Sequence, residues 1–487
     1  MPRHLLGIDL GTSSVRAGIF RDDGTRLAIA SRTYPIETPV PGASLQDPEL
    51  WWRRTGEAIS EALALSSLKG SDISGISFCG QMHGAVLLDS GNAPVGRAVI
   101  WADSRSAAEC EEITEMLGRD VLRDTLMNRI FPGTQAAIIL WLRKYEPNSW
   151  RRVRRILLPK DYLRFRMCGL FNSEPSDASA TLLFDQNQRD WSTAVLKKLS
   201  IPIEFLPFIV ASDQVIAETE GIEEQTGIPD GVPLVLGGAD QPAAALGNAV
   251  LDEGVMFISV GTGGQIVTPL RLPRTSPGLC LNTFCHLPES RWYLMGATLA
   301  AGLSLRWFRD TFTPQASFSE LDHEAAAVSP GCEGLRFAPC IAGKRSPMLD
   351  PSAAGGFTGI RLNHTRGHFA RAVLEGVAFE LRDSLEVIWK MGIRPHTVIL
   401  SGGGAKSPLW PQILADVFDL PLALSASEEA ACFGAALLAG IGTGVYDDYW
   451  KAAELVQKPS LVIEPDSDTV SRYEEIYRGR GRCREGE

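Results

Sequence analysis

The feature that most constrains the fold of this chain is a faint internal repeat. Leu6 to Ser14 (LGIDLGTSS) aligns without gaps on Met256 to Gly264 (MFISVGTGG), which begins 250 residues later in a chain of 487. Each copy reads as an apolar strand, a Gly-Thr turn and the start of a second strand. A repeat spaced by about half the chain predicts two equivalent lobes. We place these lobes at residues 1–246 and 247–487.

The turn of each copy has the composition of a phosphate site. Leu10 to Ser14 is rich in hydroxyl groups and free backbone N–H groups, which can hold phosphate oxygens. Asp9, immediately before this turn, is placed to orient a magnesium ion through water. Two such hairpins, one on each lobe, predict a nucleotide clamped between the lobes. The turn alone is equally compatible with an ordinary hairpin that has a polar tip.

A glycine-flanked carboxylate lies near the middle of the chain, in the stretch GGADQP from Gly237 to Pro242. An apolar run precedes this stretch, and a run of alanines that predicts a helix follows it. Glycines at a strand-to-helix junction allow a ligand to approach the backbone, and Asp240 can accept a proton from a bound hydroxyl group. The alternative is that Asp240 only caps the following helix.

Two further motifs suit a ligand with many hydroxyl groups. GQMHG, residues 80–84, comes at the end of a predicted strand at 73–78, and WADSR, residues 101–105, precedes a predicted helix at 106–117. An aromatic face, a carboxylate and a guanidinium group within five residues can stack on a sugar and bind its hydroxyl groups. A lone histidine is more often structural, and Asp103 can instead cap the helix after it.

The second half contains a glycine-rich loop, SGGGAKS, at residues 401–407, between a predicted strand at 397–400 and a predicted helix at 410–418. Ala405 stands where a Walker motif needs glycine, so a P-loop is not indicated. The loop instead suits a backbone packed against adenine and ribose, with a small-residue helix at 428–440 beside it. We also predict a helix at 296–308 and a frayed, charged tail from about residue 471.

Composition excludes several classes of protein. A formal net charge of −11 argues against general binding to nucleic acid or to an anionic membrane. The longest uncharged runs, such as residues 254–270, are interrupted by glycines and are too short to cross a bilayer. Nine cysteines without any CxxC pair indicate neither a disulfide framework nor a zinc ribbon. We therefore expect reduced thiols and a cytoplasmic location.

Taken together, these motifs resemble the FGGY carbohydrate kinases, and among them most closely the xylulokinases. The resemblance covers nearly the whole chain, and QMHG is its most specific pointer to a ketopentose. The motifs that carry it stand in the family order and lie at residues 7–13, 80–84, 101–105, 158–162, 237–241, 261–263 and 401–407.

The resemblance implies an α/β fold of two actin-like, ribonuclease-H-like lobes, with a nucleotide and sugar cleft between them. It implies phosphoryl transfer from ATP and Mg2+ to the terminal hydroxyl of a ketopentose, most closely D-xylulose. It also implies that Asp240 is the catalytic base and that Asp9 supports magnesium and phosphate. The substrate residues it implies are Met82, His83, Trp101, Asp103 and Gln241 together with Asp240, and the nucleotide residues are Thr12, Ser13, Thr262, Gly302, Gly404 and Lys406. The implied partner is a small-molecule sugar, and a homodimer is compatible with the chain.

Two departures from the family pattern concern the substrate. GKRSP at residues 343–347 replaces the usual Gly-Glu-Arg-x-Pro, with Lys344 in the glutamate position, and Gln241 stands where xylulokinases often have asparagine. The open alternatives within the kinases are another ketose such as ribulose, a deoxy-ketopentose or a polyol. Outside them, the alternatives are a non-catalytic sugar sensor, which intact Asp240 and Asp9 disfavour, and an actin-like ATPase, which leaves the QMH and WAD motifs unexplained.

Overall fold

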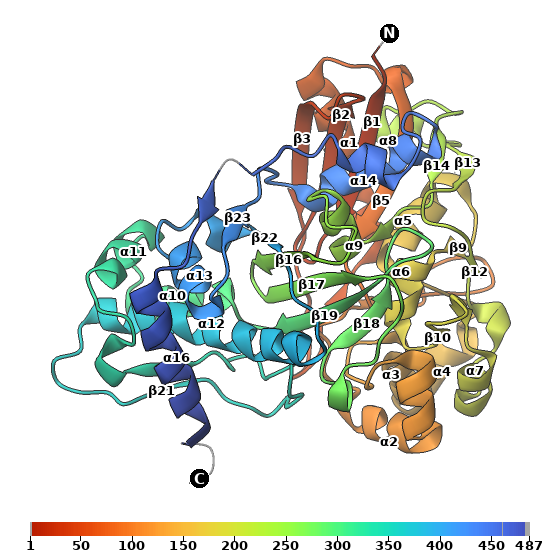
Figure 1. Cartoon of the computed structure of the whole chain (residues 1–487). Helices are drawn as coiled ribbons and strands as arrows, with labels where there is room; N and C mark the ends of the chain where they lie inside the picture. The colour runs from red at the N-terminus through yellow and green to blue at the C-terminus, as the bar shows by residue number, and fades with distance from the viewer. Residues whose placement is uncertain (1, 460, 483–487) are drawn as a thin grey trace.

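A computed structural model describes residues 2–459 and 461–482 as two α/β lobes, each built around a mixed sheet (Figure 1). In the described segments, the first sheet has the order β13-β14-β5-β1-β2-β3, with β15 also pairing with β5, and the second has the order β18-β19-β17-β16-β22-β23-β24. The strands of the first sheet are β1 (His4–Leu10), β2 (Ser14–Arg21), β3 (Arg26–Thr33), β5 (Ile73–Gly80), β13 (Val215–Glu218), β14 (Pro233–Val235) and β15 (Gly238–Ala239). Those of the second are β16 (Val255–Val260), β17 (Gly264–Leu270), β18 (Asn282–Cys285), β19 (Trp292–Thr298), β22 (Thr397–Ser401), β23 (Leu422–Leu424) and β24 (Val462–Ile463).

The repeat predicted from the sequence is confirmed by the topology of the two sheets. β1 pairs antiparallel with β2 and parallel with β5, and β16 pairs antiparallel with β17 and parallel with β22. Each turn is closed by a backbone hydrogen bond, from Gly11 N to Ser14 O at 3.0 Å and from Gly261 N to Gly263 O at 2.9 Å, so the second turn is one residue shorter. The two Gly-Thr hairpins therefore occupy equivalent positions in equivalent lobes.

Helices cover both sheets, and short strand pairs join the loops. The helices are α1 (Pro48–Ser66), α2 (Ala107–Leu117), α3 (Gln135–Tyr145), α4 (Pro147–Arg152), α5 (Pro159–Cys168), α6 (Pro175–Ala178), α7 (Thr193–Leu199), α8 (Glu223–Thr226), α9 (Asp240–Leu246), α10 (Gly302–Phe312), α11 (Phe318–Ala326), α12 (Arg366–Lys390), α13 (Trp410–Phe418), α14 (Ala430–Gly442), α15 (Tyr449–Ala453) and α16 (Ser467–Arg482). The short pairs are β4 (Leu45–Gln46) with β7 (Ala98–Val99), β6 (Val86–Leu88) with β8 (Arg155–Leu157), β9 (Asn172–Ser173) with β12 (Phe208–Ile209), β10 (Phe184–Asp185) with β11 (Asp190–Trp191), and β20 (Arg336–Ala338) with β21 (Gly356–Thr358). None of the helices in the described segments combines the length and apolarity needed to span a lipid bilayer.

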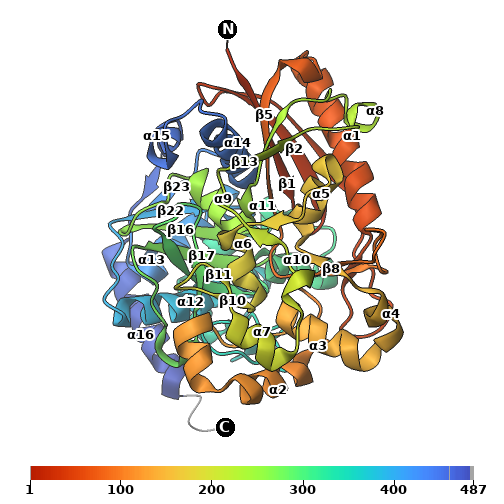
Figure 2. The same cartoon turned by 90° about the vertical axis from the view of Figure 1, so that its right-hand side faces the viewer.

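The first sheet lies between two helices from opposite ends of the chain. In Figure 2, α1 lies on one side of this sheet and α14 on the other, and α14 contacts β1, β2 and β5. The contact with the sheet is close, because a Cβ atom on Gly7 would lie 2.1 Å from the carbonyl oxygen of Cys432; α14 packs equally closely on α9, where a Cβ atom on Gly434 would lie 1.9 Å from the carbonyl oxygen of Ala243. Part of the C-terminal half thus belongs to the core of the first lobe.

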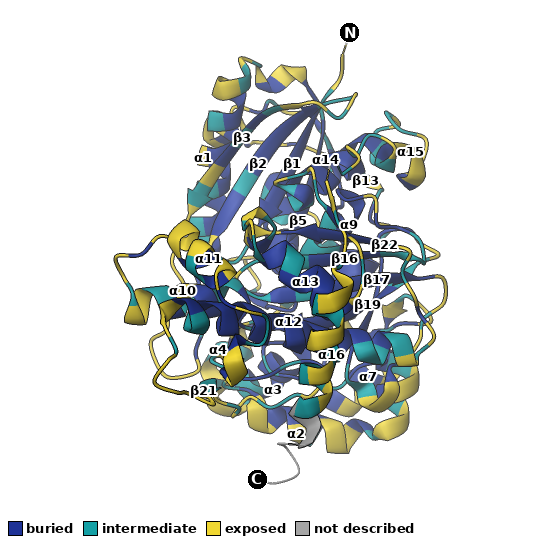
Figure 3. Cartoon of the chain, turned by 60° about the vertical axis from the view of Figure 1, so that its left-hand side comes forward, coloured by how far each residue is buried: buried dark blue, intermediate teal, exposed yellow. Residues whose placement is uncertain are grey.

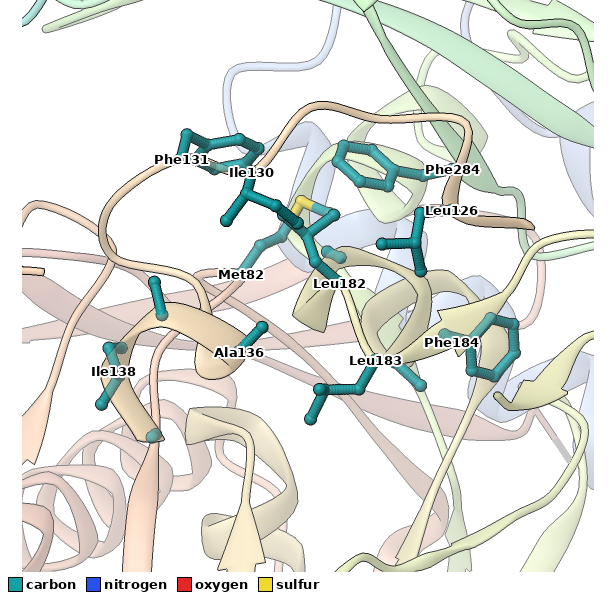
Figure 4. Packing of buried hydrophobic residues seen from close by; sticks show 14 of the residues in the cluster. Met82, Leu126, Ile130, Phe131, Ala136, Ile138, Leu182, Leu183, Phe184 and Phe284 are labelled. Carbon is teal, nitrogen blue, oxygen red and sulfur yellow. The ribbon is translucent and has the colours of Figure 1, made fainter. Parts of the chain in front are cut away.

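The segment that includes α2, α3, α4 and α7 extends the first lobe and connects it to the second. Figure 4 shows Met82 packed among apolar side chains from this segment and against Phe284 of β18. Asn128 reinforces the contact, since its side chain donates to Thr283 O at 2.8 Å and accepts from Thr283 N at 3.0 Å. The two lobes therefore share a buried junction in this region.

Two predictions about secondary structure are wrong. The predicted helix at 296–308 begins as strand, because β19 runs to Thr298 and α10 starts only at Gly302. The charged tail from about residue 471 is not frayed where the structure describes it, because α16 places Tyr473 in the core at 1% exposure. The hydroxyl of Tyr473 donates to Glu375 at 2.7 Å and accepts from Arg371 at 2.9 Å. The outer side of α16 is exposed (Figure 3), and residues 483–487 lie outside the described part of the chain.

Candidate active site

Asp9 and Asp240 meet at one edge of the first sheet. β1 and β15 both run parallel to β5, with Asp9 opposite Cys79 and Gly238 also opposite Cys79. Parallel strands end at a common edge, and ligands of α/β sheets bind outside the carboxyl ends of the strands. Asp240 follows β15 directly, so the two carboxylates come from strand ends on either side of β5.

Asp240 and Gln241 each carry a buried side-chain oxygen at the start of α9. Its Oδ1 atom and the Oε1 atom of Gln241 are both buried and have no hydrogen-bond partner among the described residues. Burial, and then the charge of Asp9, raise the pKa of Asp240 from 3.8 to about 7. The helix-cap alternative does not describe this residue, because Ala239 holds the N-cap position of α9 and Asp240 is its first residue.

Asp9 is 6% exposed and has two protein contacts. Its Oδ2 atom lies 3.4 Å from Nη1 of Arg16, and its Oδ1 atom accepts from Sγ of Cys79 at 3.6 Å. Burial raises the pKa of Asp9 more than Arg16 lowers it. The described residues contain no cluster of three or more histidine, cysteine or acidic side chains that could hold a metal ion.

The first Gly-Thr hairpin is tied to the predicted sugar residues by side-chain hydrogen bonds. Nε1 of Trp101 donates to Oγ1 of Thr12 at 2.9 Å, and Nε2 of Gln46 donates to Thr12 O at 2.7 Å. Gln46 in turn accepts from Nε2 of Gln81 at 2.9 Å. Ser13, at the tip, is exposed. Trp101 and the QMHG segment therefore position the hairpin that we expect to hold phosphate.

The second hairpin gathers three of the predicted nucleotide residues at the end of β16. The start of α10 binds it through its backbone, with Gly302 N donating to Gly261 O at 2.8 Å and Leu303 N to Thr262 O at 3.0 Å. Gly404 packs on the same strand end, where a Cβ atom would lie 2.5 Å from Cγ1 of Val260. Lys406 lies apart from this group, because its side chain is 68% exposed and forms an ion pair with Glu428 at 2.9 Å.

Met82 and His83 are both 4% exposed. In Figure 4 the sulfur of Met82 lies between Ile130 and Phe284, and the hydroxyl of Tyr293 approaches this sulfur to 3.9 Å. Met82 therefore lies in an apolar wall to which both halves of the chain contribute.

His83 has a strained backbone and a fixed tautomer. Its φ of 74° is uncommon for a residue other than glycine and is often associated with functional sites. Nδ1 lies 2.8 Å from Ala180 O and must donate to it, whereas Nε2 lies 3.3 Å from Nη2 of Arg345 and must accept. Burial, and then Arg345, lower the pKa of His83 to about 3, so the ring is neutral. Both ring nitrogens are thus used within the protein.

Asp103 is 3% exposed, and its carboxylate is also used within the protein. It accepts from Ser44 N at 2.9 Å and forms an ion pair with Arg105 at 2.8 Å. It does not cap α2, whose N-cap is Ser106. Asp103 therefore holds together the loops that surround Trp101.

Three side chains that were not predicted as site residues lie beside the predicted ones: Gln46, Tyr293 and Arg345. Tyr293 lies in β19, where burial and the nearby Asp240 raise the pKa of its hydroxyl. Gln46 and Tyr293 lie in segments without a motif, so no local pattern marks them. Arg345 belongs to the GKRSP loop, whose departure from the family pattern was the one available signal.

Comparison with known proteins identifies the family. Family models described as the N-terminal and C-terminal domains of the FGGY family of carbohydrate kinases match residues 4–247 and 256–443. The chain is 35% identical to a xylulose kinase of Bacillus subtilis over 98% of its length and 95% of the relative, and 38% identical to one of Lactococcus lactis with the same coverage.

The fold is also that of solved members. A crystal structure described as a xyloylose kinase from Brucella ovis superposes with a TM-score of 0.90 at 30% identity, covering 99% of this chain and 98% of the other. A xylulose kinase from Rhodospirillum rubrum gives a TM-score of 0.89 at 28% identity over 99% and 98% of the two chains. With two lobes of the same topology and both family domains matched, the chain belongs to the FGGY family of carbohydrate kinases and is an enzyme that phosphorylates a sugar.

Proposed function

We propose that this kinase transfers the γ-phosphoryl group of ATP to the terminal hydroxyl of D-xylulose, forming D-xylulose 5-phosphate. The names of the similar proteins from Bacillus subtilis and Lactococcus lactis support the choice of substrate. The QMHG segment, which follows β5 at the sheet edge where Asp9 and Asp240 lie, carries the part of that similarity that is most specific to a ketopentose. The reaction takes place in the cytoplasm, and a homodimer remains a prediction for sedimentation analysis.

The observation that carries the proposal is the pair of unpartnered acceptors at the start of α9. Oδ1 of Asp240 and Oε1 of Gln241 are buried without a hydrogen-bond partner among the described residues. A buried acceptor without a donor costs free energy, so such a pair is expected to have a ligand that supplies O–H groups. Adjacent hydroxyl groups of an acyclic sugar satisfy both.

In the proposed mechanism, Asp240 accepts the proton of the terminal hydroxyl as that oxygen attacks the γ-phosphorus in line. A pKa of about 7 suits this role, because such a carboxylate is both ionised and basic near neutral pH. Gln241 orients a neighbouring hydroxyl, and the Met82 wall excludes water from the sugar. The protein thus contributes position and charge to a reaction that needs little covalent chemistry.

Asp9 is the residue that we propose to hold Mg2+, through water. The ion would neutralise charge on the phosphates, and Asp9 would fix its place relative to Asp240. Thr12, Ser13 and Thr262 would supply backbone N–H and hydroxyl donors to the phosphates. Gly302 and Gly404 would let the nucleoside lie against the backbone, and Lys406 would act only at the rim, after leaving Glu428.

The remaining sugar residues have different proposed roles. Trp101 presents its face to the sugar while its indole N–H holds Thr12. Asp103 keeps the Trp101 loop in place through Ser44 and Arg105. His83 contributes ring edge and shape, because both of its nitrogens already have partners within the protein.

A coupled assay of ADP release with a panel of sugars tests the proposal. We expect D-xylulose to give the highest kcat/KM among D-xylulose, ribulose, deoxy-xylulose, xylitol and gluconate, with turnover that requires a divalent metal. A higher kcat/KM for another member of the panel would replace D-xylulose. ADP release that is indifferent to sugar would favour the actin-like ATPase, and sugar binding without ADP release would favour the sensor.

A further inference from the structure

The GKRSP loop of the second lobe places the guanidinium group of Arg345 against His83, beside the apolar wall that contains Met82. The loop lies between β20 and β21, and Arg129 of the first lobe anchors it. Nη2 of Arg129 donates to Pro347 O at 2.8 Å, to Cys280 O at 3.0 Å and to Arg345 O at 3.4 Å. Arg345 is therefore held in the junction between the lobes.

The Arg345 side chain is placed by apolar and neutral groups. Its guanidinium carbon lies 4.2 Å from the centroid of the Phe131 ring, and its Nη2 atom lies 3.3 Å from Nε2 of the neutral His83 ring. Within the described segments, no carboxylate forms an ion pair with Arg345, and its Nε atom is buried without any hydrogen-bond partner. Although the chain has a net charge of −11, this cation has no carboxylate partner among the residues that the structure describes.

The absence of a counter-charge has an energetic consequence. Burial, and then the nearby Arg129, lower the pKa of Arg345 to about 10, so the side chain is still charged at neutral pH. The side chain is partly exposed, but a charge that is partly withdrawn from water without an ion-pair partner is costly, and the buried Nε donor without an acceptor adds to that cost. An acceptor supplied by the substrate would offset both costs, in the same way as the hydroxyl groups of the sugar at Asp240.

The contacts define an order along the wall. The charge of Asp240 acts on the hydroxyl of Tyr293, and this hydroxyl contacts the sulfur of Met82. The ring of Phe284 lies 5.8 Å, between centroids, from the rings of both Tyr293 and His83. His83 in turn contacts Arg345. Arg345 is therefore connected to the proposed base only through Tyr293, Phe284 and His83 in these contacts. A ketopentose whose terminal hydroxyl lies at Asp240 directs its other end, which carries the carbonyl group, toward Arg345.

We infer that Arg345 recognises the carbonyl end of the substrate and determines the preference for a ketose over the corresponding polyol. This inference rests on the proposed function. A guanidinium group has only donors, so it favours an oxygen that is only an acceptor, such as a ketone oxygen, over a hydroxyl group. It favours a carboxylate even more strongly, and an aldonate of the same length is therefore expected to bind as a competitor.

Steady-state kinetics of Arg345→Gln and Arg345→Lys with D-xylulose and with xylitol test the inference. Loss of a hydrogen bond to a charged group predicts a fall of roughly 10- to 100-fold in kcat/KM for D-xylulose in Arg345→Gln. The value for xylitol should change much less, so the ketose-to-polyol ratio should fall. Inhibition by D-xylonate should weaken in Arg345→Gln and persist in Arg345→Lys, because lysine keeps the charge.

The controls separate recognition from folding and from the proposed function. Arg309→Gln removes a cation that pairs with Asp310 on the second lobe and should leave the ratio unchanged. A loop that only loses its shape would lower kcat/KM for D-xylulose and xylitol equally, and an unchanged ratio in Arg345→Gln would overturn the inference. Failure of the wild-type enzyme to phosphorylate D-xylulose would instead overturn the proposed function.

Discussion

Replacement of Asp240 by asparagine should inactivate the enzyme and also make it more stable. Asparagine keeps the shape of the side chain but cannot take the proton of the attacking hydroxyl. Loss of a general base typically costs roughly 10²- to 10⁴-fold in rate. We therefore expect kcat to fall by at least about 100-fold, with sugar affinity little changed.

The gain in stability follows from the raised pKa of Asp240. The pKa is about 7 in the folded protein, against an ordinary value of 3.8. The unfolded chain therefore loses this proton at lower pH than the folded chain does, and stability decreases as pH rises from about 4 to about 7. At about 1.36 kcal/mol per pKa unit, this shift costs the ionised wild type about 4 kcal/mol above pH 7 and nothing below pH 4. Asparagine does not ionise, so it avoids this cost.

Thermal unfolding across this pH range, together with ADP release at saturating substrates, measures both effects. Asp240→Asn should unfold at a higher temperature than wild type at pH 8, and the difference should disappear toward pH 4. Asp252→Asn is the matched control. Although burial opposes it, hydrogen bonds from Trp450 and Arg291 lower the pKa of Asp252, so that variant should be less stable at pH 8. A variant of Asp240 that retains more than about a tenth of wild-type kcat, or that is no more stable at pH 8, would refute the reasoning.

Three further predictions concern pH dependence and packing. In a plot of kcat/KM against pH, the wild-type activity should fall on the acid side near pH 7. In Asp9→Asn the residual activity should fall at a lower pH, because the charge of Asp9 helps to raise the pKa of Asp240. If the fall stays at the same pH, the charge of Asp9 does not affect the pKa of Asp240. Gly434→Ala should severely reduce soluble yield and unfolding temperature, because its Cβ atom would lie 1.9 Å from a carbonyl oxygen of α9. In the control Gly392→Ala no atom lies within 4 Å of the new Cβ atom, so the unfolding temperature should fall only through strain of the positive φ angle. Tyr473→Phe should lower the free energy of unfolding by about 1 to 3 kcal/mol in denaturant titrations, because it leaves buried Arg371 and Glu375 without the hydroxyl; equal stability would show that α16 contributes nothing through this contact.

The sequence predicted the parts of the structure that local pattern determines. The Gly-Thr repeat predicted two lobes because strand, turn and strand are contiguous in each copy. The pattern after WADSR predicted a helix at 106–117, and α2 is found at Ala107–Leu117. The Asp240 segment was identified for a similar reason, since its glycines and carboxylate are adjacent in the chain.

The remaining features depend on contacts between distant segments. His83 and Arg345 are 262 residues apart, and neither segment indicates that the other fixes the histidine tautomer. The sequence of α16 is typical of a charged tail, because Tyr473 has its hydrogen-bond partners about 100 residues away on α12; these partners are Arg371 and Glu375. Residues 296–298 form strand where a helix was predicted, because β19 pairs with β17 as far as Thr298. The small residues of this segment do not indicate that pairing. The division at residue 246 stays a prediction.

The packing of α14 on the first sheet has a consequence for the synthesis of the protein. The strands of that sheet up to Gly80 leave the ribosome early, but the helix that covers them follows about 350 residues later. At 5 to 20 residues per second, translation of this interval takes roughly 20 to 70 s. During that time the apolar face of β1 and β5 has no cover from its own chain, so the nascent protein should be a client of chaperones that bind exposed strands. The isolated first lobe should aggregate, and addition of a peptide spanning α14 should rescue its solubility.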